Sequence, residues 1–387
     1  MYHPIWGAAR FARAMRINAS SVMPTTLVPF IGTISYQKGP SLLALWRSVD
    51  VQLAVFFVIE NTPDKAVIAA ANEMGGGCET QALPVWLEAR WSSRYLESSE
   101  EFRVCVPRHS NVHEYHVLRW LQNNGVARGW NTILRHGFGL GAPYVVVAND
   151  DIAFTPNSLH TFHKFTMLQL RKQPIFFASM GMLVKGMLVK EKVVASQPFS
   201  LFSFTQGLVE RVGYYDENFF PAYYEDTDMR VRFNLLAVET YMVPNATFTH
   251  QSPPGGTGVS LQPSITQKLN AVMHRRSCNA VYFARKWKCH VKYDKWGWGR
   301  IYADGMAARP SEGAKNMIWR HFSPSAPWPH ATRRSALATA LSRWYPVDIE
   351  RRQYSAHGNA TTCFYCLPQS MPQVKTGVCK DGLRMQS

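Results

Sequence analysis

The sequence predicts an α/β fold, with a mostly parallel sheet that helices cover on both faces. Compact apolar runs alternate with segments of helical pattern along the first half of the chain, as in parallel doubly covered sheets. These runs do not alternate between apolar and polar residues, which is typical of strands buried on both faces. The 387 residues are 46% hydrophobic, enough for a sizeable core, so a mainly disordered chain is excluded.

Each expected strand is a β-rich apolar run that ends at polar or turn-forming residues. The expected elements are a strand at 27–32, a helix at 41–47, a strand at 51–59, a helix at 64–74, a strand at 102–106, a mostly helical segment at 116–137 and a strand at 144–148. Further on, the pentapeptide GMLVK occurs twice in tandem, from Gly181 and from Gly186. Two copies are too few for a repeat fold, so we expect a hairpin or loop there.

In such a sheet, ligands bind at the carboxyl ends of the strands, so polar residues just after strands are the candidates. Thr33 and Ser35 follow the first strand, and Asp150 and Asp151 follow the strand at 144–148. Two adjacent carboxylates repel one another, and Mg²⁺ or Mn²⁺ shared with diphosphate oxygens relieves that repulsion. The alternative is an Asp that caps the helix expected from about residue 156.

A second acidic cluster, Tyr224-Glu-Asp-Thr-Asp228, begins another helical stretch. A carboxylate beside aromatic residues suits a general base that takes a proton from a hydroxyl. The alternative is an acidic helix N-terminus, with Asp228 and Arg232 as an i,i+4 ion pair. His250, at the end of a strand expected at 241–250, is by itself more typical of a structural histidine.

The formal net charge of +16 is unevenly distributed. Residues 250–387 hold 20 of the 42 Lys and Arg residues but only 6 of the 26 Asp and Glu residues. Such a basic region attracts nucleic acid, anionic lipid or an anionic substrate, or is simply a solvated surface. Because the chain has neither zinc-finger spacing nor an RRM-like aromatic motif, we expect no nucleic-acid partner.

The seven cysteines are too few and too scattered for a disulfide scaffold, and we expect Cys363 and Cys366 to be unpaired thiols. No apolar stretch reaches the length of a membrane span and no apolar h-region follows the start, so we expect a cytoplasmic or peripheral membrane location. Sequons for N-glycosylation begin at Asn18, Asn245 and Asn359, and they matter only in a secreted protein.

Taken in order and spacing, five stretches resemble family 2 glycosyltransferases of the GT-A fold, particularly the rhamnosyltransferase-like and galactofuranosyltransferase-like members. The stretches are 124–131 (NGVARGWN), 144–151 (YVVVANDD), 212–219 (VGYYDENF), 224–228 (YEDTD) with Arg232, and 243–246 (VPNA) with His250. The resemblance covers about Thr26 to Lys288. It implies a Rossmann-like GT-A domain at 26–290, between an N-terminal segment at 1–25 and a basic, Trp-containing C-terminal extension at 291–387.

The resemblance also implies a role for each polar cluster. Asn149-Asp150-Asp151 stands at the D-x-D position, with Asn in place of the first Asp. Asp151 and His250 are the implied metal ligands, and Asp150 is implied to meet the donor ribose or a metal-bound water. Asp226 is the implied catalytic base, with Glu225 as the alternative. The implied donor-binding residues are Thr33, Glu60, Asn61, Asn131, Asn149 and Asp150.

The implied activity is an inverting glycosyltransferase that depends on Mn²⁺ or Mg²⁺. The expected donor is a nucleotide sugar, with a UDP-sugar favoured, and the expected acceptor is a hydroxyl of a glycan, a glycolipid or a protein-linked acceptor. Peripheral membrane contact through the basic tail would serve a lipid-linked acceptor. The alternative is a non-catalytic protein of the same fold that binds glycans or an acidic partner.

Overall fold

The structure is a computed structural model of the whole chain. It describes residues 27–36, 39–61, 64–87, 101–121, 124–184, 187–188, 199–217, 219, 222, 224–250, 290–293 and 299–302. The expected N-terminal segment, Cys363, Cys366 and most of the expected basic extension lie outside these residues. The boundary expected near residue 290 stays a prediction.

The chain forms two compact units. The first unit comprises Met1–Val212 and Ala237–Gly258, and the second unit comprises Gly213–Leu236 and Val259–Ser387. Among the residues that the structure describes, none of the helices has both the length and the apolar character needed to cross a bilayer.

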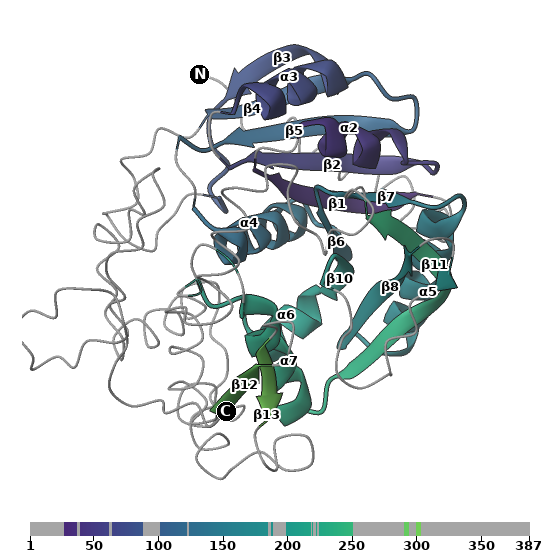
Figure 1. Ribbon diagram of the computed structural model, residues 1–387. Helices are drawn as coiled ribbons and strands as arrows, with labels where there is room; N and C mark the ends of the chain where they lie inside the picture. Colours follow the sequence, from purple (N-terminus) through teal and green to yellow (C-terminus); the bar gives the residue numbers. More distant parts are fainter. Residues whose placement is uncertain are drawn as a thin grey trace, which may run out of the picture. The chain divides into compact units, whose positions relative to one another are not determined.

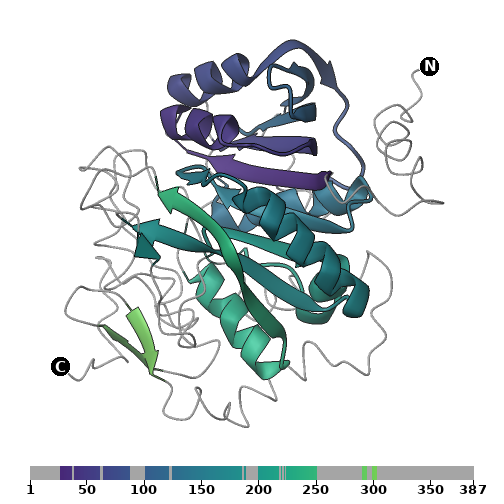
Figure 2. The ribbon, with the colours of Figure 1, turned by 90° about the vertical axis from the view of Figure 1, so that its right-hand side faces the viewer.

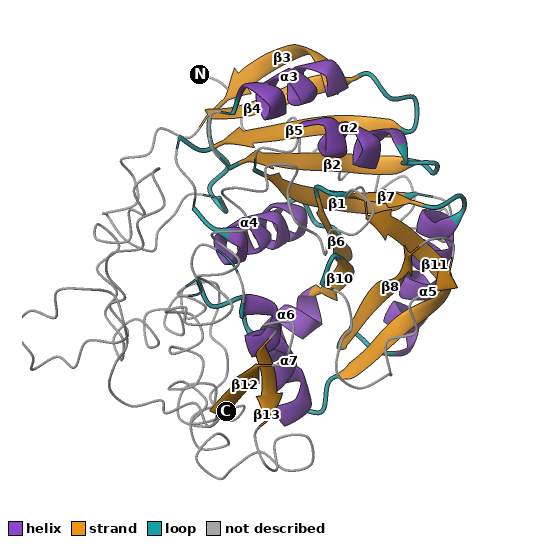
Figure 3. Cartoon of the chain, viewed as in Figure 1, coloured by secondary structure: helices purple, strands orange, loops and turns teal. Residues whose placement is uncertain are grey.

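The first unit is built around one large mixed sheet (Figures 1 and 3), in the strand order β3-β4-β5-β2-β1-β6-β10-β8-β11-β7, with β9 paired to β8. The strands are β1 (Val28–Ser35), β2 (Leu53–Glu60), β3 (Gly75–Gln81), β4 (Glu101–Pro107), β5 (Val112–Arg119), β6 (Tyr144–Asn149), β7 (Ile152–Phe154), β8 (Phe176–Val184), β9 (Met187–Leu188), β10 (Leu201–Thr205) and β11 (Glu239–His250).

Helices of the first unit connect these strands. They are α2 (Gly39–Arg47), α3 (Lys65–Met74), α4 (Val126–Gly139), α5 (Ser158–Lys172) and α6 (Gln206–Val212). The second unit contains α7 (Glu225–Leu235) and the antiparallel pair β12 (His290–Tyr293) and β13 (Gly299–Tyr302).

The α/β class predicted from the sequence is confirmed, and the parallel part of the sheet is its centre. The pairs β5–β2, β2–β1, β1–β6 and β8–β11 are parallel. The pairs β3–β4, β4–β5, β6–β10, β8–β10 and β7–β11 are antiparallel. The unalternated apolar runs thus predicted β1, β2 and β6, whose residues are buried almost throughout.

Helices cover both faces of the sheet (Figure 2), and two adjacent residues of β2 contact helices on opposite faces. The Phe56 ring lies 5.0 Å from the Trp46 ring of α2, measured between centroids, and the Phe57 ring lies 4.4 Å from the His136 ring of α4. Successive side chains of a strand point to opposite faces. Helices α2 and α4 therefore lie on opposite faces of the sheet, and every residue of β2 is buried between them.

The segment expected to be mostly helical, 116–137, is divided in the structure. Its first residues complete β5, and α4 begins only at Val126, after Gly125 at a φ of 81°. Strand β5 has a parallel partner on one side and an antiparallel partner on the other, so ladder hydrogen bonds outweigh the local helical pattern. The tandem GMLVK copies form the antiparallel pair β8–β9, as the hairpin interpretation predicted.

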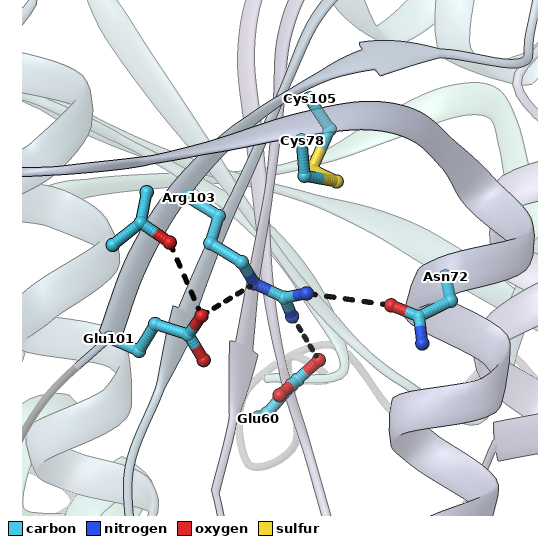
Figure 4. The surroundings of a disulfide bond; sticks show 7 residues. Glu60, Asn72, Cys78, Glu101, Arg103 and Cys105 are labelled. Atoms are coloured by element: carbon cyan, nitrogen blue, oxygen red, sulfur yellow. Dashed lines mark hydrogen bonds and ion pairs between the residues drawn. A yellow bond between two sulfur atoms is a disulfide. The ribbon is translucent and has the colours of Figure 1, made fainter.

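The strand expected at 102–106 is β4, but its edge partner β3 was not predicted, and a disulfide between Cys78 and Cys105 links the two strands (Figure 4). Three successive glycines begin β3. Gly75 is required for packing, because a Cβ atom there would lie 2.6 Å from the ring of Tyr115. The bond is a covalent link that the cysteine spacing did not reveal, and the other five cysteines lie outside the described residues.

Candidate functional site

The candidate site lies in the first unit, where the parallel strands β1 and β6 end side by side. Ser35, the last residue of β1, donates from Oγ to Asp150 Oδ2 at 2.8 Å. The backbone N–H of Tyr36 points to the same oxygen at 3.3 Å. Asp150 is buried, so these donors stabilise its charge and fix its carboxylate against the end of β1.

Asp151 and His250 lie side by side at this edge. His250 is paired with Ile152 in the β7–β11 ladder, which brings its ring beside Asp151. His250 Nδ1 lies 3.5 Å from Asp151 Oδ1, and 20% of the histidine side chain and 8% of the aspartate side chain are exposed. The structure therefore brings together two residues that are 99 positions apart in the sequence, the two that the family resemblance implies as metal ligands.

The other nitrogen of His250 contacts Ser200, just before β10. Ser200 Oγ lies 3.3 Å from His250 Nε2. The carbonyl of Ser200 accepts a hydrogen bond from the backbone N–H of Asn149 at 2.8 Å, so Ser200 is anchored to the end of β6. Sequence reasoning missed Ser200, because nothing in the local pattern indicates that it meets a residue 50 positions further on.

Neither aspartate caps a helix, which was the alternative to a ligand site. Strand β7 follows Asp151 directly, and the N-cap of α5 is Asn157. The backbone N–H of Asn157 donates instead to the carboxylate of Asp50 at 2.6 Å. Asp150 and Asp151 thus lie at the sheet edge because they directly follow β6, and not because they cap α5.

Asp151 and His250 fit a shared divalent cation. His250 Nδ1 is buried and has no hydrogen-bond partner among the described residues, although it lies beside the carboxylate of Asp151. Two neighbouring ligands of an octahedral ion about 2.1 Å away lie about 3 Å apart, close to the observed separation. No cluster of three or more His, Cys, Asp or Glu ligands occurs within the described part of the chain, so other oxygens would complete the shell.

Glu60, one of the expected donor-binding residues, pairs with two arginines, and Figure 4 shows its contact with Arg103. Its buried carboxylate accepts hydrogen bonds from Arg103 Nη2 at 3.1 Å and from Arg119 Nε. Arg119 also donates from Nη1 to Glu101 at 2.7 Å. Both oxygens of Glu60 thus contact arginines from β4 and β5, a partnership that sequence spacing could not reveal.

Asn61 connects the end of β2 to the start of α4. Its backbone N–H donates to the carbonyl of Ser35, and its side-chain Oδ1 accepts from the N–H of Asn124, both at 2.9 Å. Arg128 of α4 donates to Asn124 Oδ1 at 2.9 Å, and its guanidinium lies 5.4 Å from the ring centroid of Trp120. These contacts hold a buried arginine near the strand ends, and sequence reasoning assigned it no role.

The remaining expected donor-binding residues are also positioned by the sheet and by α4. Thr33 lies in β1 and is fully buried. Asn131 lies in α4, one turn after Arg128, and is 1% exposed. Asn149, the last residue of β6, is half-buried. Each of these residues lies at or behind the edge formed by β1, β2 and β6, and a donor-binding role for them stays a prediction.

The second unit holds the other acidic cluster, on α7. Asp228 and Arg232 form a buried i,i+4 ion pair, and Arg232 also donates to the carbonyl of Tyr214 at 2.6 Å. This confirms the structural alternative for Asp228. Asp226 has 31% of its side chain exposed, and its Oδ1 accepts from the N–H of Thr227 at 2.6 Å.

Of the two candidate bases, Asp226 is the more accessible, since Glu225 is only 5% exposed. Burial raises the pKa of the neighbouring Tyr215 hydroxyl well above 10.0, and the charges of Asp226 and Glu225 raise it further. Tyr215 therefore stays neutral at physiological pH, so it adds no negative charge beside the acidic residues at the start of α7.

No protein-family model matches the chain, and no curated protein matches it in sequence. Among solved structures, it is similar to the crystal structure of GalNAc-T7 with UDP, GalNAc and Mn²⁺. The TM-score is 0.42 and the identity 12%, over 83% of this chain and 58% of that one, so the chain spans little more than half the length of that protein. So distant a likeness carries no functional argument, and the proposal below rests on the residues of the site.

Proposed function

We propose that the chain is a metal-dependent glycosyltransferase that moves a sugar from a nucleotide-sugar donor to an acceptor hydroxyl. The observation that carries this proposal is the pair formed by Asp151 and His250, 3.5 Å apart at the edge where the parallel strands end. That edge is where open α/β sheets bind their ligands. Asp150, held by Ser35, adds a fixed carboxylate beside the pair.

Asp151 and His250 are the residues that would hold the divalent cation, Mn²⁺ or Mg²⁺. When bound there, the cation supplies Lewis-acid stabilisation of the negative charge that develops on a diphosphate leaving group. The chain's own residues orient the donor: Asp150 accepts a hydrogen bond from a ribose hydroxyl, and Asn61 and Asn131 contact the nucleotide. We favour UDP as the nucleotide.

Asp226 acts as the general base in the proposed reaction. The acceptor oxygen forms a bond to the anomeric carbon, the bond from that carbon to the diphosphate breaks, and Asp226 takes the acceptor proton. This in-line displacement inverts the anomeric configuration. Thr227 donates to Asp226 Oδ1 and Arg230 lies 3.8 Å from Oδ2, so the carboxylate is held in one orientation.

The test is donor turnover with Mn²⁺ across UDP-, GDP- and dTDP-sugars, in the wild type and in Asp151→Ala and Asp226→Asn. The matched control is Glu73→Gln, at an exposed carboxylate of α3 that pairs with Arg47. We expect turnover with one nucleotide class, a loss of at least about 100-fold in each site variant, and no change in the control.

The outcomes also separate the second candidate, a non-catalytic binding protein of the same fold. The presence of only two protein ligands in the described cluster favours it. Binding of UDP and Mn²⁺ without turnover of any donor would support that candidate. Full transfer activity in Asp226→Asn would show that another group is the base.

A further inference from the structure

Strand β11 contains an exposed irregularity in its middle. Its register with β8 shifts between Met242 and Thr247. Within this stretch, Pro244 and Asn245 are both exposed, whereas Val243, the residue just before them, is buried. A regular strand would not expose two successive residues beside a buried one, so the backbone bulges outward at this point.

The bulge presents the side chain of Asn245 to solvent. Asn245 has a φ of 60°, in the left-handed region that asparagine tolerates better than most residues. Pro244 followed by a residue of positive φ is the residue order of a type II turn. The backbone conformation therefore places Asn245 at an exposed position, whichever rotamer its side chain adopts.

Asn245 begins the sequon Asn245-Ala246-Thr247. In the folded chain the hydroxyl of this Thr247 is already engaged, since its Oγ1 lies 2.7 Å from Thr155 Oγ1. The N–H of Thr247 also donates to Ser158 Oγ at 2.9 Å. The threonine thus anchors the strand just after the bulge, while the asparagine two residues earlier is left outside.

A second, independent observation comes from the other end of the same unit. Cys78 and Cys105 form a disulfide between β3 and β4. Structural disulfides form and persist in oxidising compartments and are rare in the cytosol. The compartment in which this bond forms is also the one in which an exposed sequon is used.

We propose that Asn245 carries an N-linked glycan, added in an oxidising secretory compartment. In this step, Asn245 Nδ2 forms a bond to the anomeric carbon of an oligosaccharide carried on a lipid diphosphate. The bond from that carbon to the diphosphate breaks, and the amide loses one proton. The folded chain engages the hydroxyl of Thr247, which the sequon needs, so the glycan is added before β11 pairs with β7 and packs against α5.

This inference is independent of the proposed glycosyltransferase activity. It concerns the chain as the recipient of a glycan and not as the enzyme that adds one. It also excludes the cytoplasmic location expected from the sequence, because a cytoplasmic chain would meet neither the oxidant nor the lipid-linked oligosaccharide. One experiment therefore decides between the two locations.

The full chain is to be purified from cells that naturally make it and treated with peptide N-glycosidase in heavy-oxygen water. We expect the peptide that contains residue 245 to carry Asp with one heavy oxygen in place of Asn. Peptide mapping without reductant is expected to recover Cys78 linked to Cys105. Site-specific mapping is required because Asn18 and Asn359 also begin sequons.

Two variants provide the control. Asn245→Gly removes the acceptor amide but tolerates the positive φ, so the fold is retained and one glycan mass is lost. Thr247→Ser keeps both the sequon and a hydroxyl, so the glycan is retained. An unmodified Asn245 in the purified chain would overturn the proposal, whether or not the other sequons are occupied. Free thiols at Cys78 and Cys105 would overturn the assignment of the compartment.

Discussion

His116 Nδ1 and His136 Nε2 lie 2.9 Å apart in the core of the first unit, between β5 and α4. Trp86 Nε1, which can only donate, lies 3.2 Å from His136 Nδ1. The proton of His136 is therefore on Nε2, which donates to His116, and His116 Nε2 in turn donates to Glu114 at 3.1 Å. Burial, and then the neighbouring His116, lower the pKa of His136 well below 6.5, so the imidazole of His136 is neutral.

Trp86→Phe is expected to destabilise the protein by about 1–3 kcal/mol, because it leaves His136 Nδ1 buried without its donor. The phenylalanine ring still covers Gly139, where the indole packs, so the loss reports the hydrogen bond. The measurement is the free energy of unfolding in urea. Val85→Ala, at a neighbouring side chain that is 63% exposed, is the control and should change stability by less than about 0.5 kcal/mol.

Stability is expected to rise with pH between about 4 and 6.5 because of His163. Burial, and then His160, lower the pKa of His163 from 6.5 to about 4. In this window the unfolded chain binds a proton that the folded chain does not, so acid favours unfolding, by up to about 3 kcal/mol. The check is the free energy of unfolding measured as a function of pH.

His163→Phe should flatten that pH dependence. Tyr144→Phe is the matched control, because it removes the 2.5 Å contact between the Tyr144 hydroxyl and His163 Nδ1 but keeps the titrating ring. If both variants keep the wild-type slope, the group responsible for the pH dependence lies elsewhere.

Asp228→Ala and Asp226→Asn are expected to separate a structural acid from a catalytic one. Asp228→Ala removes the carboxylate that pairs with the buried Arg232, at a cost of about 3–5 kcal/mol. The measurement is hydrogen exchange along α7, which should become faster throughout the helix. Asp226→Asn should leave exchange unchanged while abolishing transfer, and faster exchange in this variant would mean that Asp226 is structural as well.

Ser200→Ala is expected to weaken Mn²⁺ binding about 10-fold. A histidine that binds a metal through one ring nitrogen is oriented by the hydrogen bond of its other ring nitrogen, which Ser200 accepts from His250. A cation on His250 Nδ1 requires the ring proton on Nε2, which then donates to Ser200 Oγ. The measurement is Mn²⁺ titration without donor. Ser200→Thr keeps the hydroxyl and should bind as the wild type does. Equal affinity in all three proteins would mean that Ser200 does not orient the ring.

Sequence patterns predicted the buried centre of the sheet and failed where tertiary pairing decides the structure. The apolar runs at β1, β2 and β6 predict strands because strands buried on both faces are mostly continuous runs of apolar residues. The segment that forms β5 has mixed polarity, and its strand depends on neighbours that lie far away in the sequence. Local pattern does not carry that information.

The candidate site shows the same division. Asp150 and Asp151 could be found from the sequence, because they follow directly on a predicted strand. Glu60 could be found in the same way, but its two arginine partners come from β4 and β5, so its ion pairs could not be predicted.

The opposite packing of Phe56 and Phe57 has a consequence for how this chain can vary. Inserting or deleting one residue in β2 would exchange the two rings, so that Phe57 faced Trp46 and Phe56 faced His136. The same slip would turn Glu60 away from Arg103 and Arg119. A change in the length of β2 would therefore disturb the packing of both helix layers and the ion pairs of Glu60 together, so we expect β2 to tolerate no insertion or deletion.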